Sequence, residues 1–241
     1  MNNQINDKKA ELIHHRRDQI LAAAKRIFAQ KGFRRTKIDE IAAYLNLGKG
    51  TLYRYFKDKK ALFLAIFEQG LAQLRQSIMT YVEPIADPRE RLAAAVRTYF
   101  EFFDNNKELI EIMMQVRSEF KDEYRRIFMA VYSDYIVRIQ ENLRKGIEIG
   151  VFRELDIEKT AEAISATLQG ILQSFYIREF GAEAAAADTE KETLVGSDYT
   201  ADDKRQHGKV RNRQLLTDRV EAVTKLLLSG LLKPESVKNL L

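Results

Sequence analysis

The chain has 241 residues, of which 45% are hydrophobic and 31% are charged, a composition ordinary for a globular protein. It has no cysteine and three histidines, which excludes disulfides, thiolate metal sites and a cysteine nucleophile and disfavours a histidine metal site. No run approaches the roughly 18 uncharged apolar residues of a membrane span, and the N-terminus lacks a signal-peptide pattern, so we expect a cytoplasmic protein without a cofactor.

Positive charge is concentrated at one end of the chain. Residues 1–60 hold 15 Lys and Arg against 6 Asp and Glu, whereas the remainder holds 25 against 29. This asymmetry is what a polyanion-binding N-terminal segment would show. A basic face that is merely solvated is the alternative interpretation.

The spacing of apolar residues predicts an all-α protein of about nine helices. Proline and glycine are scarce, at 3 and 11 residues, and apolar side chains recur at three- and four-residue steps. Gly32 is expected to stop the first helix, and Asp58 and Asp156 are expected to cap later ones. In chain order, helices are predicted near residues 14–30, 37–44, 49–55, from 59 on, 89–104, 106–117, 121–148, 157–179 and 214–231, with a connector at 82–90.

The pattern divides the chain into two predicted domains. Residues 1–60 are predicted to form a three-helix domain, and residues 61–241 are predicted to form a larger helical domain. Within the latter, residues 181–213 have few large apolar side chains and no clear period, which predicts a mobile surface insertion with a helical turn or two at EAAAAD. A functional lid is the alternative for this insertion.

The two short helices at 37–44 and 49–55 have the pattern of a helix-turn-helix. Ile38, Ile41 and Ala42 give the first helix an apolar side, and Asn46 tolerates the left-handed backbone that the turn needs. Thr36 is placed to cap the first helix or to reach a DNA phosphate. In the second helix Leu52 and Phe56 are predicted to face inward, which leaves Lys49, Thr51, Tyr53, Arg54 and Tyr55 facing outward with Lys57, Lys59 and Lys60 beyond them.

This segment resembles the DNA-binding domain of the TetR family of bacterial transcriptional regulators. The resemblance rests on Ile20–Phe33, Thr36–Ala42 and Leu47–Leu62, the last reading LGKGTLYRYFKDKKAL. Two positions depart from the family pattern: Asn46 replaces the usual turn glycine, and Gly48 replaces the usual serine or threonine, which puts that hydroxyl's phosphate contact in doubt. The resemblance implies that residues 1–60 are a DNA-binding domain and that residues 61–241 are an effector-binding and dimerisation domain. It also implies DNA contacts by Thr36, Lys49, Gly50, Thr51, Tyr53, Arg54, Tyr55 and Lys59.

The C-terminal part carries less family signal, although residues 143–172 resemble the family's turn and dimer helix. For the dimer interface we expect Ile164, Leu168, Ile171, Phe175, Val220, Val223 and Leu227. For an apolar effector pocket the candidates are Tyr99, Phe100, Phe103, Met113, Met114, Phe120, Tyr124 and Phe128, with Arg117 and Glu119 as polar groups. Ordinary core packing, with both charged residues on the surface, is the alternative.

The leading functional hypothesis is a homodimeric repressor that binds an inverted-repeat operator and is released by a small, largely apolar effector. The alternative is a regulator controlled by a protein partner that contacts the 181–213 insertion. An enzyme is not expected, because the carboxylates Glu108, Glu111, Asp122 and Glu123 lack a nucleophile–base arrangement. The cluster His14 to Arg17 is either a minor-groove arm or the solvated start of the first helix.

Overall fold

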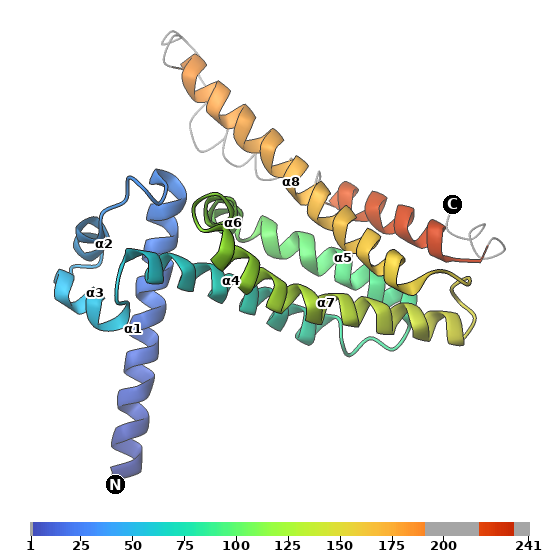
Figure 1. Cartoon of the computed structure of the whole chain (residues 1–241), viewed down its shortest axis with the longest axis horizontal. Coiled ribbons are helices and arrows are strands. Elements are labelled where there is room, and N and C mark those ends of the chain that lie inside the picture. Colours follow the sequence, from blue (N-terminus) through green and yellow to red (C-terminus); the bar gives the residue numbers. More distant parts are fainter. Residues whose placement is uncertain (1, 191–216, 234–241) are drawn as a thin grey trace, which may run out of the picture. The chain divides into compact units, whose positions relative to one another are not determined.

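The computed structural model describes residues 2–190 and 217–233, and within them the chain is helical apart from turns (Figure 1). The labelled helices are α1 (Asn2–Lys31), α2 (Ile38–Tyr44), α3 (Lys49–Tyr55), α4 (Lys59–Tyr81), α5 (Pro88–Asp104), α6 (Lys107–Glu119), α7 (Lys121–Glu148) and α8 (Ile157–Glu190). A further helix covers residues 217–231. The all-α prediction is confirmed. None of the helices in the described residues combines the length and apolarity needed to cross a membrane.

The local signals in the sequence set most helix ends. Gly32 follows α1 with a φ of +81°, and Gly150 follows α7 with a φ of +77°, a backbone region that favours glycine. Asp58 accepts a hydrogen bond from the Ala61 N–H (2.7 Å), and Asp156 accepts one from the Lys159 N–H (3.1 Å), so both predicted N-caps are confirmed.

Two predicted helix boundaries were wrong. The first helix begins at Asn2 and not at residue 14, and α8 continues to Glu190 and not to 179. The first ten residues of the predicted insertion, 181–190, are therefore helical, whereas 191–213 lie outside the described residues. Neither extension has a regular apolar stripe, so the sequence pattern gave no reason to continue either helix.

The described residues divide into two compact units. The first contains residues up to Gln76 together with 105–131, and the second contains 77–104 and the part of the chain from Tyr132 on. The sequence placed a boundary at residue 60. The first unit is larger because α4 up to Gln76, all of α6 and the start of α7 pack with α1.

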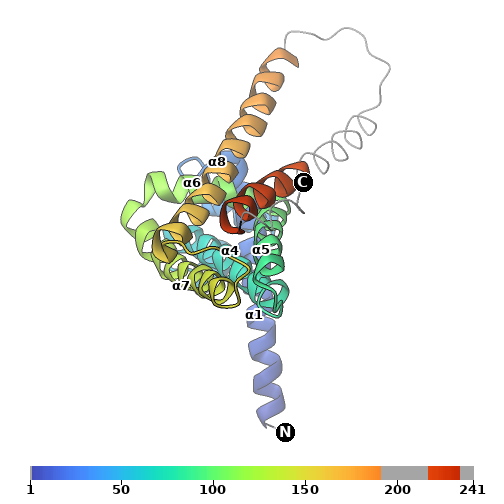
Figure 2. The same ribbon diagram turned by 90° about the vertical axis from the view of Figure 1, so that its right-hand side faces the viewer.

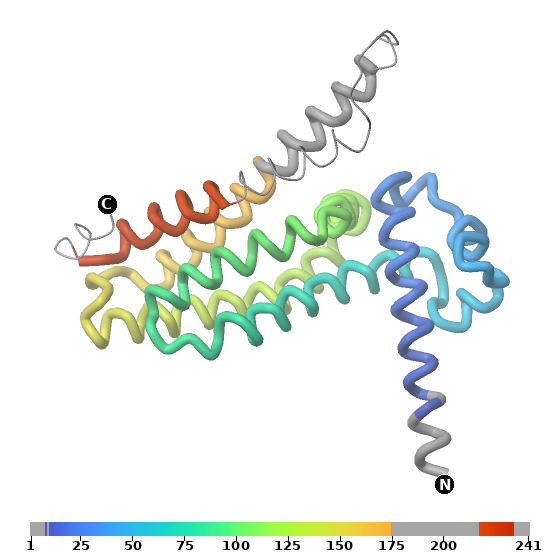
Figure 3. The backbone as a smooth tube through the Cα atoms, turned by 180° about the vertical axis from the view of Figure 1, so that it is seen from behind, coloured from blue at the N-terminus to red at the C-terminus, as the bar shows by residue number. Residues whose placement is uncertain are grey.

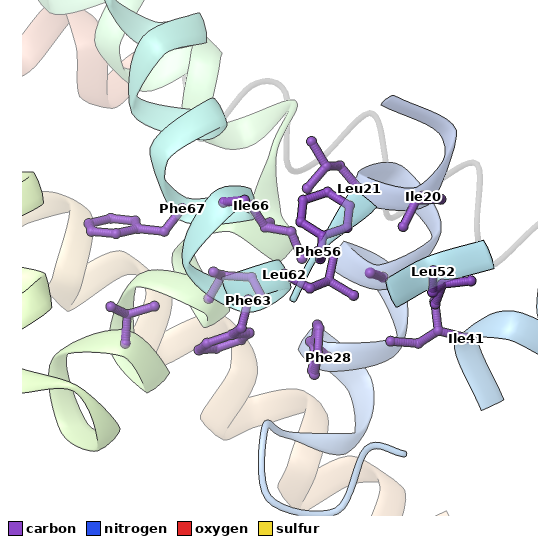
Figure 4. Close-up of a cluster of buried hydrophobic side chains, with 14 of the residues drawn as sticks. Ile20, Leu21, Phe28, Ile41, Leu52, Phe56, Leu62, Phe63, Ile66 and Phe67 are labelled. Carbon is purple, nitrogen blue, oxygen red and sulfur yellow. The ribbon is translucent and has the colours of Figure 1, made fainter. Parts of the chain in front are cut away.

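The core of the first unit is built from apolar side chains of α1, α2, α3, α4, α6 and α7, part of which Figure 4 shows. Phe28 of α1 and Phe63 of α4 are fully buried, with ring centroids 4.9 Å apart. Leu52 of α3 and Ile41 of α2 are also buried and join the helix-turn-helix to α1. Burial of such side chains contributes roughly 1.5–3 kcal/mol each, so this core holds the two short helices in place.

The second unit combines α5, most of α7, α8 and the helix 217–231, and Figures 2 and 3 show that last helix alongside the first half of α8. The α7–α8 turn is tied to the end of the last helix. Phe152 forms an isolated antiparallel bridge with Leu232, and the Arg153 guanidinium donates to the Gly230 carbonyl (2.7 Å).

Candidate nucleic-acid interface

The helix-turn-helix forms as the sequence predicted. Asn46 adopts a left-handed backbone with a φ of +53°, and the Leu47 N–H closes the turn by donating to the Ala42 carbonyl (2.9 Å). Leu52 and Phe56 are buried on the inner side of α3. These contacts fix the orientation of α3, so its outer side is the candidate interface.

The outer side of α3 carries four exposed positions and two half-buried ones. Lys49, Gly50 and Arg54 are exposed, as is Tyr53, of which 44% is accessible. Thr51 and Tyr55 are half-buried, and Tyr55 packs against the core of the first unit. The exposed set joins a long cation, a guanidinium and a phenol, groups able to bind phosphates and base edges.

Thr36 is not part of this exposed surface. Its side chain is 1% accessible, and its hydroxyl donates to the Gly32 carbonyl (2.8 Å). The expectation that it caps α2 was wrong, because Lys37 is the N-cap residue and α2 has no side-chain cap. The hydroxyl instead ties the segment before α2 to the end of α1.

Lys59 is also occupied within the first unit. Its ammonium donates to the carbonyls of Phe33 (2.9 Å) and Thr36 (3.0 Å), and it lies 4.4 Å from the centre of the Phe33 ring. Lysine is therefore placed here to satisfy backbone carbonyls of the loop between α1 and α2. A phosphate could reach it only in competition with those carbonyls.

Lys49 forms an ion pair across the helix-turn-helix. Its ammonium lies 3.0 Å from the Asp39 carboxylate of α2, and hydrogen bonding to this carboxylate raises the pKa of Lys49. Both side chains are more than half exposed, so the pair contributes little stability. The pair holds the Lys49 ammonium near the start of α3. A phosphate could take the place of Asp39 as the partner of this ammonium.

The two glycines at the start of α3 leave open space. Gly48 is the N-cap residue with an ordinary φ of −72° and no side-chain cap. A Cβ added at Gly48 or at Gly50 would meet nothing within 4 Å. The protein itself therefore does not require glycine at either position.

Sequence reasoning missed Tyr44, which is 59% exposed on α2 and adds a second accessible aromatic side chain beside the turn. Its position between Ala43 and Leu45 gives no periodic signal for a functional role. The only sequence signal for Tyr44 was its place just before the turn that leads into the basic helix α3.

A second missed residue, Gln115 of α6, binds the end of α1. Its amide oxygen accepts from the Phe33 N–H (2.8 Å) and its amide nitrogen donates to the Phe28 carbonyl (3.2 Å). Both partners lie more than 80 residues away in sequence, so no local pattern predicts the contact.

Charged pairs surround the same junction. Arg34 pairs with Glu119 (2.8 Å), and Lys60 pairs with Glu123, which lowers the pKa of that carboxyl. Of the two charged residues considered for an effector pocket, Glu119 is therefore an ion-pair partner, and Arg117 is exposed. These pairs connect the loop between α1 and α2 to α6, and the start of α4 to the start of α7.

The residues expected to line an effector pocket fall into both units. Tyr99, Phe100 and Phe103 belong to α5 in the second unit, and their rings pack edge to face. Met113, Met114, Phe120, Tyr124 and Phe128 belong to the first unit. There Phe120 meets the Phe33 ring (4.8 Å between centroids), and Tyr124 stacks on Phe67 (5.6 Å). For Phe120 and Tyr124 the core-packing alternative therefore describes the contacts.

The expected dimer residues divide by burial. Ile164, Leu168 and Val223 are at most 6% accessible and face the interior of their own protomer, so they do not offer surface to a partner. Ile171, Val220 and Leu227 are half-buried, and the side chain of Phe175 lies outside the described residues. The apolar side of these helices was identified correctly, but that side packs within the protomer.

Comparison with known proteins identifies both parts of the chain. The family description "Bacterial regulatory proteins, tetR family" matches residues 20–66, and "Tetracyclin repressor-like, C-terminal domain" matches residues 85–173. A Bacillus subtilis relative, the uncharacterized HTH-type transcriptional regulator YhgD, is 27% identical over 181 residues, 75% of this chain and 91% of its own.

Solved structures share the fold. The fatty acid degradation regulator FadR of Bacillus halodurans is 23% identical with a TM-score of 0.66, over 89% of this chain and 95% of its own. AibR, solved in complex with isovaleryl coenzyme A and operator DNA, is 26% identical with a TM-score of 0.55, over 67% of this chain and 85% of its own. These relatives are transcriptional regulators and not enzymes.

Proposed function

Because the chain belongs to the TetR family of bacterial transcriptional regulators, we propose that it is a homodimeric, cytoplasmic repressor of an inverted-repeat operator. The observation that carries this proposal is the outer side of α3, where Lys49, Tyr53 and Arg54 are exposed on a helix held rigidly by a buried inner side. Two such helices related by a two-fold axis would read half-sites about one helical turn apart.

The exposed groups divide the work of binding. Arg54 offers a fork of donors suited to a guanine edge or a phosphate, and Tyr53 offers an aromatic face with a hydroxyl. Lys49 would exchange Asp39 for a phosphate. We expect Arg54→Ala and Tyr53→Ala to abolish sequence preference while the dimer persists.

The test is binding to promoter fragments from the source genome, including the one upstream of its own gene, measured by fluorescence anisotropy at about 150 mM salt. A discrete fragment should bind with a Kd of about 10⁻⁸ M or tighter, against 10⁻⁴–10⁻⁶ M for random DNA. Equal affinity for every fragment would refute a sequence-specific operator. An operator without two-fold symmetry would refute the dimeric arrangement.

For the effector we propose an acyl thioester of coenzyme A, whose acyl chain supplies the apolar body. Support comes from AibR, which binds isovaleryl coenzyme A together with operator DNA. Acyl-CoAs of increasing chain length should weaken operator binding by about 5- to 150-fold, and DNA should weaken acyl-CoA binding by the same factor. Free coenzyme A and free fatty acids are the controls. If no acyl-CoA of the series weakens operator binding, this effector is rejected.

Dimerisation is proposed through the outward side of α8 and of the helix 217–231. Ala163, Ala166 and Gly170 are exposed on α8, and Ala222 and Leu226 are exposed on the last helix. Leu226 is 63% accessible, a large apolar side chain that a monomer would leave in water. Small residues beside it allow helices from two protomers to approach closely.

A further inference from the structure

The N-terminal part of α1 extends past the helices on which α1 packs, as Figure 1 shows. Every side chain that the structure describes between Lys8 and Arg16 is exposed, including Leu12 at 70% and Ile13 at 47%. Among the described residues of α1, Ile20 is the first that is buried. More than two helical turns therefore have no role in the core of the first unit.

This exposed stretch starts beside the C-terminal end of α3. The Arg17 guanidinium lies 5.3 Å from the centre of the Phe56 ring, and Phe56 is the C-cap residue of α3. Asp18 accepts a hydrogen bond from Gln69 of α4 (2.9 Å). Arg54 and Lys57 are exposed at the same end of α3, so the basic surface continues from α3 onto α1.

The stretch is basic and straight. Residues 8–17 contain four Lys and Arg against one Glu. Residues seven or eight apart lie on one side of a helix, so Lys8, His15 and Arg16 share a side. At 1.5 Å per residue, Lys8 lies about 12 Å beyond Arg16 along the axis. This length matches the phosphates of about four base pairs.

We propose that residues 8–17 of α1 bind the DNA backbone that flanks the sequence read by α3, adding affinity without adding sequence preference. The proposal rests on the proposed function. DNA is the occupant that fits, because the stretch is positively charged and continuous with the exposed side of α3. A second copy of the same stretch would be repelled by its like charge.

The test uses an operator that the full-length protein selects from a random-sequence duplex library. Two duplexes are compared, the selected sequence alone and the same sequence with about six arbitrary base pairs added at each end. The wild type should bind the longer duplex on the order of tenfold more tightly at about 150 mM salt. Lys8→Gln combined with Arg16→Gln should lose most of this gain and keep the preferred sequence.

The salt dependence gives a second readout. Two charges are removed from each of two protomers, so the slope of log K against log salt should fall by up to about 3.6. The matched control combines Arg144→Gln with Lys145→Gln, which removes the same charge from exposed positions of the second unit. This control should retain the wild-type slope and the gain from flanking DNA.

The outcomes separate this inference from the proposed function. If the wild type and the Lys8→Gln, Arg16→Gln variant bind the selected sequence with the same gain from flanking DNA and the same salt slope, the role of α1 is overturned. The proposed function as a regulator would still stand. Enrichment of no sequence would overturn both. A change in oligomeric state on sedimentation, with unchanged DNA binding, would show that a second copy covers Leu12 and Ile13, and would also overturn the proposal.

Discussion

Gly50 lies on the exposed side of α3 between Lys49 and Thr51, where the protein alone has room for a larger residue. Glycine inside a helix is less stable than alanine by roughly 0.5–1 kcal/mol, because it loses more backbone freedom on folding. Its presence is therefore unfavourable for the isolated protein. It becomes favourable if a DNA backbone or base edge approaches α3 at this position.

Gly50→Ala should accordingly act in opposite directions on stability and on binding. We expect the free energy of unfolding to rise by about 0.5–1 kcal/mol, measured by urea denaturation, while operator affinity falls in an anisotropy titration. Gly48→Ser is the control, since its hydroxyl can cap α3 and Gly48 has an ordinary φ; stability should rise slightly without loss of affinity. Unchanged operator affinity of Gly50→Ala would argue against close approach of DNA here.

Lys59 provides a second test at the residue scale. Since its ammonium binds the carbonyls of Phe33 and Thr36, Lys59→Met should lower the free energy of unfolding by about 1.5–3 kcal/mol. Urea denaturation of the free protein measures this loss. If stability is unchanged and the salt dependence of DNA binding falls by about 0.9 per lysine, Lys59 is a phosphate contact instead.

At the scale of single elements, the start of α5 is set by Asp87. Its carboxylate accepts the Arg89 N–H (2.7 Å) and binds the Arg89 guanidinium (2.8 Å), and hydrogen bonding to that guanidinium lowers the pKa of Asp87 to about 2. Ionised Asp87 therefore stabilises the fold at neutral pH. Because the folded-state pKa is depressed, this contribution is present above about pH 4 and is lost as the pH falls through 2.

Asp87→Ala should thus reduce the free energy of unfolding by about 1 kcal/mol at pH 7, the usual effect of losing an N-cap. The difference from wild type should narrow between pH 4 and pH 2. Asp87→Asn is the control, because it keeps a capping oxygen without a titrating charge. A difference that stays constant over this pH range would show that the ionised carboxylate is not the stabilising group.

The end of α7 depends on a close helix–aromatic contact. A Cβ added at Gly146 would meet the Phe152 ring, and Phe152 is 1% accessible. Gly146→Ala should lower the free energy of unfolding by about 1–3 kcal/mol through overpacking. In the double variant Gly146→Ala with Phe152→Leu, the smaller leucine side chain should recover part of this loss. If the two changes in the free energy of unfolding are additive in a double-mutant cycle measured by urea denaturation, direct contact is contradicted.

At the scale of the whole molecule, the proposed dimer depends on exposed apolar surface of the second unit. Leu226→Arg should place a charge in that interface and convert the protein to a monomer, measured by sedimentation velocity at micromolar concentration. The helix itself should remain folded because Leu226 is exposed in the protomer. Val137→Arg, at a 49% exposed position on α7, is the matched control and should remain dimeric. A dimeric Leu226→Arg variant would place the interface elsewhere.

The sequence alone determined the features that depend on local backbone chemistry. Gly32, Asn46, Asp58 and Asp156 act over three or four residues, so their roles as stops, turn and caps were predicted correctly. The inner side of α3 was predicted for the same reason, since Leu52 and Phe56 follow the period of one helix. The helix-turn-helix of the family can therefore be predicted from the sequence without knowledge of the tertiary packing.

Only the tertiary structure decided which polar groups are already bound and which apolar sides are already covered. Thr36 and Lys59 were expected to reach DNA, but both bind carbonyls of the loop between α1 and α2. Ile164 and Leu168 were expected at a dimer interface, but they are buried within the protomer. The helical period predicts that a side chain is buried but does not identify the residues that bury it. Gln115 binds the backbone of Phe28 and Phe33, which lie more than 80 residues away in sequence, and such contacts form only in the folded chain.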